Sequence, residues 1–259
     1  MKLQNRFILF FFGFFFMVRM PIKATAQDTS DESEGWHFQL MPYLLVANVH
    51  GTLGVRELPD IAVEASAKDI FKKLKFGALI YAEAATDNWA ITSDLIYMNL
   101  GKDTQPGRII QDGKLEMKQA LWEVGVLRKI VNGVELGIGG RYNHFGTEVE
   151  LTTPSLNGPV TRTRDKGVWW VDPIVIGRFR TTIADKLMLQ LRGDVGGFGV
   201  ASAFAWQGQA YADYKFSELF QLGLGYRYLN LDYEEGTGED RFLFDVNTKG
   251  PVIRFGFNF

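Results

Sequence analysis

Twelve charged side chains are set into segments of this sequence that otherwise alternate apolar residues with small or polar ones. Six are acidic and six are arginines, a combination suited to ion pairing because the planar guanidinium can hold a carboxylate through two hydrogen bonds. Isolated charges in a narrow interior would be costly to desolvate, so the two sets are expected to pair. A second interpretation stays open, in which they line a narrow path for a solute. The twelve are Glu83, Asp94, Glu123, Glu135, Asp172, Asp213, Arg141, Arg178, Arg180, Arg192, Arg227 and Arg254.

Acid–base or metal chemistry finds few candidates in the sequence. Histidine occurs at three positions, His37, His50 and His144. None stands in a recognisable pair with a nucleophile, and no spacing typical of a metal site occurs. The absence of cysteine excludes disulfides, iron–sulfur clusters and thiolate-bound zinc. We therefore expect no catalytic site, no metal and no cofactor, and interpret the histidines as interfacial side chains.

The charged residues lie on segments with a period of two, which is the period of a β-strand. In 220–228, for example, apolar residues alternate with Gln221, Gly223, Gly225 and Arg227. A soluble sheet alternates in the same way with its apolar face inward, so the period alone does not identify a membrane protein. Ten strands are predicted, with eight or twelve as alternatives: 36–50, 75–85, 88–102, 115–130, 133–149, 164–182, 186–196, 203–215, 218–233 and 243–259.

The connections between these segments alternate in length. Tight turns are expected at 86–87, 131–133, 184–185 and 217–218, and longer loops at 51–74, 103–114, 150–163 and 234–242, with 197–202 as a short exception. Short turns at one end and longer loops at the other are the plan of an outer-membrane barrel, which needs an even number of strands. We therefore predict an all-β fold, a transmembrane antiparallel up-and-down β-barrel with a short helix in the first external loop.

The last segment, 251–259, gives the strongest indication of a membrane. Its apolar residues stand at two-residue steps and end on an aromatic ring, as Ile253, Phe255, Phe257 and Phe259. This pattern resembles the closing-strand signal of bacterial outer-membrane β-barrels. The resemblance implies an outer-membrane location and recognition by the barrel-assembly machinery, and it implies no activity. In general appearance the chain is similar to small barrels of the outer-membrane-protein A or W kind, or to porins, without a motif specific to a subgroup.

The first 26 residues have the pattern of a secretory signal peptide. A basic start precedes an apolar run over 7–18 and the small-x-small site Ala24-Thr25-Ala26. Arg19 and Lys23 separate the run from the site, which leaves an uncleaved anchor as an alternative. Cleavage after Ala26 would leave a flexible lead-in, 27–35, and one barrel domain, 36–259. It would also move the formal charge from −2 to about −6, which argues against a nucleic-acid partner.

Aromatic residues gather at the ends of the predicted strands. Rings at two levels are typical of the aromatic girdles of a membrane barrel, although ordinary core aromatics would be an alternative. Those near the periplasmic ends are Trp36, Trp89 and Phe220, and those toward the external ends are Trp169, Trp206, Tyr226 and Tyr228.

Three local features complete the prediction. Ser66 and Asp69 resemble a capping box before an amphipathic helix whose lysines would contact lipopolysaccharide phosphates, cover the barrel mouth or simply face solvent. The acidic loop 232–241 is either solvated or holds divalent cations, without the ligand spacing of a dedicated calcium loop. Pro173 lacks a ladder donor, so we expect a β-bulge or a break there.

These observations lead to three functional hypotheses. The first is an outer-membrane barrel of a Gram-negative cell envelope that acts as a structural scaffold or a narrow solute channel. The second is an outer-membrane enzyme acting on lipid A or peptides, and the third is a soluble secreted barrel that binds an apolar ligand. The expected partners are outer-membrane lipid, lipopolysaccharide, the barrel-assembly machinery and, for a channel, small solutes.

Overall fold

A computed structural model describes residues 35–55, 59–104, 112–153 and 160–259 of the chain. The predicted signal peptide, 1–26, lies outside the described residues, as does all but Gly35 of the predicted lead-in, 27–35. Within the described ranges, no helix has the length and apolar character needed to cross a membrane.

The described residues form twelve strands, one α-helix and a short 3-10 helix. They are β1 (His37–Leu45), β2 (Asn48–Val55), β3 (Ile61–Ala65), α1 (Ala67–Lys73), β4 (Leu74–Ala85), β5 (Trp89–Thr104), β6 (Asp112–Val131), β7 (Val134–Thr153), β8 (Val160–Ala184), β9 (Leu187–Gly196), β10 (Phe204–Lys215), β11 (Phe220–Glu235), η2 (Gly238–Asp240) and β12 (Phe242–Asn258).

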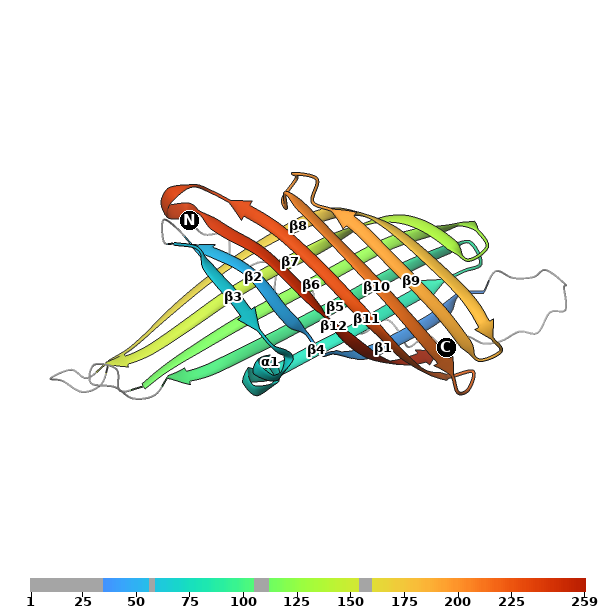
Figure 1. Ribbon diagram of the computed structural model, residues 1–259, viewed down its shortest axis with the longest axis horizontal. Helices are drawn as coiled ribbons and strands as arrows, with labels where there is room; N and C mark the ends of the chain where they lie inside the picture. The colour runs from blue at the N-terminus through green and yellow to red at the C-terminus, as the bar shows by residue number, and fades with distance from the viewer. Residues whose placement is uncertain (1–34, 56–58, 105–111, 154–159) are drawn as a thin grey trace, which may run out of the picture. The chain divides into compact units, whose positions relative to one another are not determined.

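Ten of these strands form a closed antiparallel barrel (Figure 1). Strands β4 to β12 pair in chain order, and β1 closes the sheet by pairing with both β4 and β12. The prediction of an up-and-down barrel of ten strands is thereby confirmed, with β2 and β3 as additional strands. We call the end with the tight β4–β5, β6–β7, β8–β9 and β10–β11 connections the turn end, and the opposite end the loop end.

The first predicted strand, 36–50, is divided in two by the structure. β1 pairs with the turn-end half of β12, and β2 pairs with its loop-end half. Val46 and Ala47 connect β1 to β2. The amide of Val46 still donates to the carbonyl of Pro251 at 2.9 Å. Gly250 permits this close approach, because a Cβ there would collide with the Val46 carbonyl. The interpretation of 51–74 as one loop is wrong, since it holds most of β2, all of β3 and α1.

Pro173 does not interrupt its strand, so the expected bulge or break is absent. β8 pairs with β7 in unbroken register on both sides of the Gly140–Pro173 pair. The carbonyl of Pro173 accepts a hydrogen bond from the amide of Gly197 at 3.2 Å, so the proline nitrogen faces the same neighbour. The pairing of β9 with β8 ends at Gly196, and the missing donor therefore lies where the ladder has already ended.

Successive residues along each strand alternate between an exposed apolar face and a buried polar face. In β9, the exposed side chains are Leu189, Leu191 and Val195, while Gln190, Arg192 and Asp194 are buried. A soluble sheet would show the reverse arrangement. An apolar outer wall on a closed barrel suits a hydrocarbon surround, because the backbone groups are paired within the protein.

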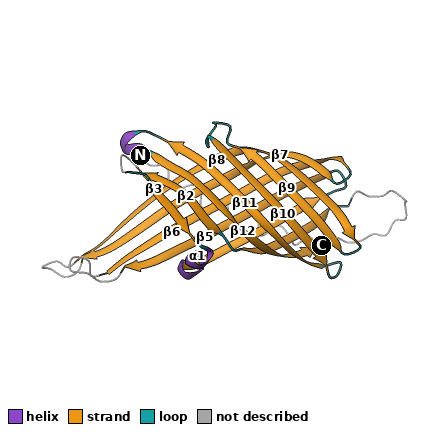
Figure 2. Ribbon diagram, viewed as in Figure 1, coloured by secondary structure: helices purple, strands orange, loops and turns teal. Residues whose placement is uncertain are grey.

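The strands differ in how far they reach at the loop end. β5 to β8 contain 16, 20, 20 and 25 residues and extend together beyond their neighbours (Figures 1 and 2). β9 and β10 contain only 10 and 12 residues. The wall is therefore lower at β9 and β10, where the connection 197–203 lies against the interior.

Candidate functional site

The interior at the turn end holds a cluster of two arginines and two glutamates. Arg178 donates through Nε to Glu135 at 2.5 Å and through Nη1 to Glu83 at 2.5 Å. Arg180 donates to the Oε1 atoms of the same two carboxylates, to Glu83 at 3.0 Å and to Glu135 at 2.8 Å, and the Glu83 Oε1 atom is shared with Arg178 Nη2 at 3.1 Å. The hydroxyl of Tyr81 donates to Glu83 at 2.5 Å. Each carboxylate thus accepts from both guanidiniums, and the cluster is formally neutral.

A second neutral cluster of two arginines and two acids crosses the centre of the barrel. Arg141 on β7 donates to Glu123 on β6 at 3.2 and 2.9 Å and also contacts Asp194 on β9. Arg192 contacts Glu123 and lies 3.3 Å from Asp194. The amide of Gln207 on β10 donates to Asp194 at 2.8 Å. The four charged side chains are at most 2% exposed, and we call Glu123, Arg141, Arg192 and Asp194 the central quartet.

Asp94 and Arg227 form the third charged group of the interior, a buried ion pair across the barrel. Arg227 on β11 donates to the Oδ2 atom of Asp94 on β5 at 2.8 Å. Tyr43 on β1 completes the group, because its hydroxyl donates to Asp94 Oδ1 at 2.7 Å and accepts from Arg227 at 2.8 Å. These contacts join strands that lie apart in the sheet, so the pair ties opposite parts of the wall together.

Asp213 and Arg254 form the fourth charge pair, between β10 and β12. The guanidinium of Arg254 donates to both carboxylate oxygens of Asp213, through Nε at 2.7 Å and through Nη2. It also lies 3.8 Å from the ring centre of Tyr211, a cation–π distance. Gly223 on β11 stands between the two, and a Cβ there would collide with Asp213 and lie 2.7 Å from Arg254. The inward glycine therefore makes room for the pair.

Asp172 is buried without an arginine partner within 4 Å among the described residues. Four neutral donors hold it instead. Ser202 donates through its backbone amide and its hydroxyl, each at 2.8 Å, Trp170 donates through Nε1 at 3.0 Å, and Asn143 donates at 3.1 Å. Ser202 is itself fully buried. Asp172 thereby fastens the β9–β10 connection, 197–203, to the interior.

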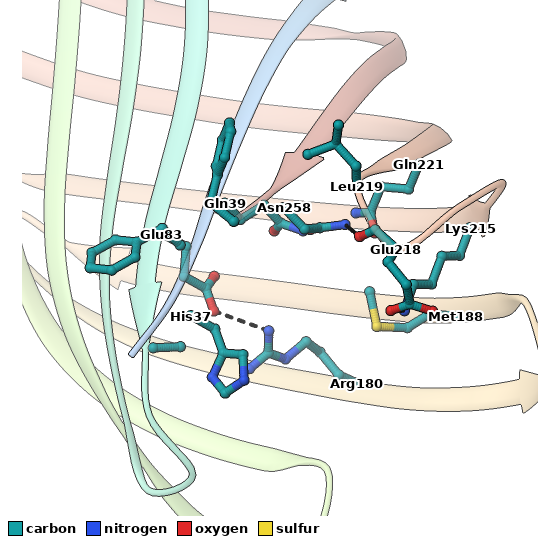
Figure 3. Close-up of a pocket in the computed structure, with 13 residues that line it drawn as sticks. His37, Gln39, Glu83, Arg180, Met188, Lys215, Glu218, Leu219, Gln221 and Asn258 are labelled. Atoms are coloured by element: carbon teal, nitrogen blue, oxygen red, sulfur yellow. Dashed lines mark hydrogen bonds and ion pairs between the residues drawn. The ribbon is translucent and has the colours of Figure 1, made fainter. Parts of the chain in front are cut away.

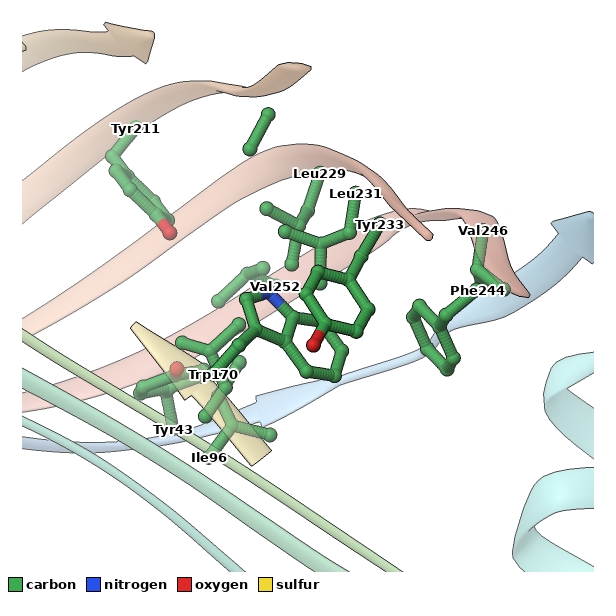
Figure 4. Packing of buried hydrophobic residues seen from close by; sticks show 12 residues of the cluster. Tyr43, Ile96, Trp170, Tyr211, Leu229, Leu231, Tyr233, Phe244, Val246 and Val252 are labelled. Atoms are coloured by element: carbon green, nitrogen blue, oxygen red, sulfur yellow. The ribbon is translucent and has the colours of Figure 1, made fainter. Parts of the chain in front are cut away.

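An apolar and aromatic cluster occupies the interior beyond these polar groups, toward the loop end (Figure 4). The ring of Trp170 stacks on that of Tyr233 at 4.1 Å and 6°, and Phe244 packs against Trp170 at 5.6 Å. Phe145 and Phe242 pack on the same group. Buried aliphatic members include Ile96, Leu121, Leu229, Leu231, Val246 and Val252.

The structure brings the twelve sequence-predicted charges into the interior. Eleven are buried and Arg180, whose side chain is 30% exposed, faces the turn-end opening. Sequence reasoning missed Asp194 and Tyr43, although Asp194 stands two residues after Arg192 and is therefore in phase with it. The spacing from Arg192 could have identified Asp194 as an interior residue. Its hydrogen-bond partners could not be identified in this way, because they lie on other strands and depend on how those strands pair.

A pocket of about 590 Å³ opens at the turn end (Figure 3). Glu83 and Arg180 form its inner boundary, and their ion pair is drawn in the figure. Lys215 and Glu218, joined at 2.6 Å, lie at its rim with His37. The pocket therefore ends against the turn-end cluster.

The remaining predicted site residues lie on the outer wall or at the strand ends. Of the girdle residues, Phe220 and Tyr228 are half-buried and the rest are exposed: Trp36, Trp89, Trp169, Trp206 and Tyr226. Trp206 stacks on Tyr228 at 4.5 Å. In the closing strand, Ile253 and Phe255 face outward, Phe257 is half-buried and Phe259 is 71% exposed. His144 also lies on the outer wall, beside Gly146 and Gly167.

The predicted helix and acidic loop both carry local contacts. α1 begins at a capping box, in which Ser66 and Asp69 exchange side-chain and backbone hydrogen bonds. In the acidic segment, Arg241 donates to Glu234 at 2.8 Å and to Asp60 at 2.6 and 3.1 Å. These bonds from Arg241 hold the pKa of Asp60 below its usual value. In the described part of the chain, no group of three His, Asp or Glu side chains is arranged to hold a metal ion.

This geometry defines a class: a small membrane-type β-barrel with an apolar outer wall and a charge-paired, filled interior. No protein-family model and no curated protein matches the chain. Among solved structures, the chain is similar to the outer membrane protease OmpT from Escherichia coli, with 8% identity, a TM-score of 0.48, and 90% of this chain and 99% of that chain covered.

Two further solved structures have a lower similarity. Ail, the attachment invasion locus protein of Yersinia pestis, has 11% identity and a TM-score of 0.36, over 87% of this chain and 99% of that chain. The monoaromatic hydrocarbon channel CymD has 10% identity and a TM-score of 0.34, over 87% and 88%. The chain's own strand pairing and exposure pattern give it the fold of a closed antiparallel β-barrel with an apolar outer wall. Its assignment to the outer-membrane-protein A or W kind stays a prediction.

Proposed function

We propose that this protein is an integral outer-membrane β-barrel whose interior is closed and which acts as a structural scaffold of a Gram-negative cell envelope. The exposed apolar wall supports insertion in a bilayer, and the two levels of aromatic side chains suit its interfaces. The turn end would face the periplasm and the loop end the exterior. Secretion by the predicted signal peptide and recognition of 251–259 by the assembly machinery belong to this proposal.

The single observation that carries the proposal is the central quartet. Its four charged side chains come from three strands and are at most 2% exposed, so they leave little space for a solute to pass. A barrel of this strand number is narrow enough for side chains to fill. The aromatic cluster around Trp170 and Tyr233 closes the interior a second time toward the loop end. Any solute path would have to displace both layers.

Single-channel recording in planar bilayers tests the proposal. We expect the unaltered protein to insert without discrete conductance steps. The double variant Glu123→Ala with Arg141→Ala removes one acid and one base, leaves the net charge of the interior unchanged, and should produce steps if it also loosens the aromatic layer. Conductance of the unaltered protein that changes when Glu123→Gln is introduced would contradict the closed scaffold and favour the narrow solute channel.

A second candidate, an outer-membrane enzyme acting on lipid A or peptides, has one observation in its favour. A pocket of about 320 Å³ between β2, β3 and α1 groups His50, Glu64 and Ser66, with His50 Nε2 3.6 Å from Glu64. The Ser66 hydroxyl, however, donates to Asp69 at 2.5 Å instead of to the histidine. Lipid A mass spectra and peptide cleavage, compared between the unaltered protein and His50→Ala, test this candidate. Identical products from the two would count against it.

A further inference from the structure

The pocket of about 590 Å³ at the turn end occupies the mouth of the barrel, and we call it the turn-end pocket (Figure 3). Side chains from several strands line it, among them Gln39 on β1, Met188 on β9 and Gln221 on β11. A volume of this size lies in the range of roughly 300–1,000 Å³ that holds small organic ligands. In the orientation proposed above, the pocket opens to the periplasm and ends against the ion pair of Glu83 with Arg180.

The carboxylate at the inner end of the pocket has no capacity left for a ligand. Glu83 Oε1 accepts hydrogen bonds from Arg178 Nη2 at 3.1 Å and from Arg180 Nη1 at 3.0 Å. Glu83 Oε2 accepts from Arg178 Nη1 and from the Tyr81 hydroxyl, each at 2.5 Å. Each oxygen thus already accepts two hydrogen bonds, which fills its lone pairs. A cationic ligand would have to displace one of these donors to reach Glu83.

The cations that line the pocket are more accessible than this carboxylate. The side chain of Arg180 is 30% exposed, and that of Lys215 is 42% exposed. Lys215 Nζ donates to Glu218 at 2.6 Å, which leaves it with further N–H groups, because an ammonium carries three. The Glu218 side chain is 96% exposed, so water screens its negative charge. The turn-end pocket therefore favours an anion.

Gln221 supplies a second donor beside Lys215. The two residues pair directly across β10 and β11, so their side chains are neighbours on the same face of the sheet. Gln221 is only 6% exposed, and its Nε2 atom has no hydrogen-bond partner in the part of the chain that the structure describes. Gly256 on β12 makes room for this side chain, since a Cβ there would lie 2.5 Å from Gln221 Cγ. A buried amide without an acceptor is unfavourable, and a ligand oxygen would satisfy it.

Apolar side chains form another part of the lining. Met188 lies on β9, between the strands that carry Arg180 and Lys215, because β9 pairs with β8 on one side and with β10 on the other. Ala85 on β4 and Leu219 in the β10–β11 turn add aliphatic surface. Met188 and Ala85 are half-buried, so a ligand can contact them, and the unbranched Met side chain adapts to different shapes. Donors beside apolar walls suit an anion that carries an apolar body.

We propose that the turn-end pocket binds a small organic monocarboxylate with an apolar body. The carboxylate accepts hydrogen bonds from Lys215 Nζ and Gln221 Nε2, and the apolar body packs against Met188 and Ala85. A binding site in this position goes beyond the scaffold function, because a ligand held against the closed interior opens no path through the barrel.

The charges around the pocket favour one negative charge over two. Lys215 is shared with Glu218, and Arg180 is shared with Glu83 and Glu135. A doubly charged phosphate would therefore bring more negative charge than these cations balance.

NMR titration of the full barrel in lipid nanodiscs, with methionine methyl groups labelled, tests this proposal. The probes are naphthoate, its neutral isostere naphthamide, naphthylmethylammonium and naphthyl phosphate. We expect naphthoate to shift the methyl signal of Met188 saturably and to bind about 10-fold more tightly than naphthamide, because only the carboxylate forms charge-assisted hydrogen bonds. The signal of Met98, which packs against the aromatic and aliphatic cluster toward the loop end, should not move.

Three substitutions change the proposed contacts in different directions. Lys215→Gln should weaken naphthoate binding about 10-fold. Gln221→Leu should weaken it about 5-fold without lowering the free energy of unfolding, because it removes a donor that has no partner in the protein. Glu218→Gln should strengthen binding about 3-fold, because it removes the carboxylate that competes for Lys215.

Lys186→Gln is the matched control for Lys215→Gln. Lys186 is exposed in the neighbouring turn, where its carbonyl accepts from the amide of Lys215 at 2.8 Å, and its side chain lies outside the pocket lining. The control removes the same charge and should keep the affinity for naphthoate, and heat-modifiable migration should show every variant folded.

Equal binding of naphthoate and naphthamide, tighter binding of the ammonium probe, or equal affinity of Lys215→Gln and Lys186→Gln would overturn the proposal. Tighter binding of naphthyl phosphate would overturn the choice of a carboxylate. Because Lys215 and Glu218 are accessible at the rim, their variants test the site even if Gln221→Leu fails to fold. The bilayer recording tests the closed scaffold separately, since it does not depend on a ligand.

Discussion

Replacing Arg141 by Met is expected to destabilise the barrel strongly. Arg141 donates to Glu123 at 3.2 and 2.9 Å and also contacts Asp194, and its side chain is fully buried. Removing one partner of a buried ion pair costs about 3–5 kcal/mol, because the remaining charge is left uncompensated. Arg192 still contacts both acids in the variant. We therefore expect a loss near the lower limit, about 3 kcal/mol in the free energy of unfolding.

Urea unfolding in detergent micelles or lipid vesicles, followed by tryptophan fluorescence, measures this loss. Lys215→Gln is the matched control, since Lys215 and Glu218 form an exposed ion pair at 2.6 Å, and it should change the free energy by less than about 1 kcal/mol. Adding Glu123→Gln to Arg141→Met restores the charge balance and should recover part of the loss. An effect of Arg141→Met no larger than that of the control would refute the reasoning, because it would mean that water screens the interior charges.

Three further predictions concern other parts of the barrel. Asp172→Ala removes the acceptor of both Ser202 donors, at about 1–3 kcal/mol each, while Trp170 and Asn143 keep a second acceptor, so it should free the β9–β10 connection, seen as faster amide hydrogen exchange there. Gly223→Val should prevent folding, judged by the loss of heat-modifiable migration, whereas Gly140→Ala, with 3.9 Å to its nearest neighbour, should fold. Arg241→Gln should raise the pKa of Asp60 in carboxyl-carbon NMR titrations, because it removes the bonds that lower it; an unchanged pKa would contradict this cause. Any stability from this pair is present above the usual pKa of Asp60 and is lost as pH falls through the lowered value.

Much of the barrel could be predicted because its strands obey one rule over their whole length. A period of two assigns each residue to a face, and the twelve interior charges were found in this way. The additional strand β3 could not be found from this rule. It is five residues long, it lies within the segment interpreted as one loop, and its partner β2 is held in place by pairing with β12, far away in the sequence.

The pairing of the interior charges could not be predicted from the sequence either. The period shows that Arg192 and Asp194 point inward, yet it cannot show that both meet Glu123 or Arg141. Those contacts depend on the tilt of the strands and the stagger of their register, which are properties of the closed barrel as a whole. The effect of Pro173 could not be predicted for the same reason. β8 accommodates this proline without a bulge because the pairing of β9 with β8 ends beside it, at Gly196.

The charge balance of the interior explains why Asp172 is bound differently from the other acids. With Asp194 included, seven interior acids face six arginines, and the arginines are all taken up by the two clusters and the two pairs. Asp172 lies where the polar interior meets the aromatic cluster, and its donors are neutral. Two of them come from Ser202, in the β9–β10 connection. The Asp172 carboxylate receives these two hydrogen bonds only when the β9–β10 connection is folded into the barrel. Because a buried carboxylate needs its hydrogen bonds, Asp172 couples the position of this connection to the folding of the barrel interior.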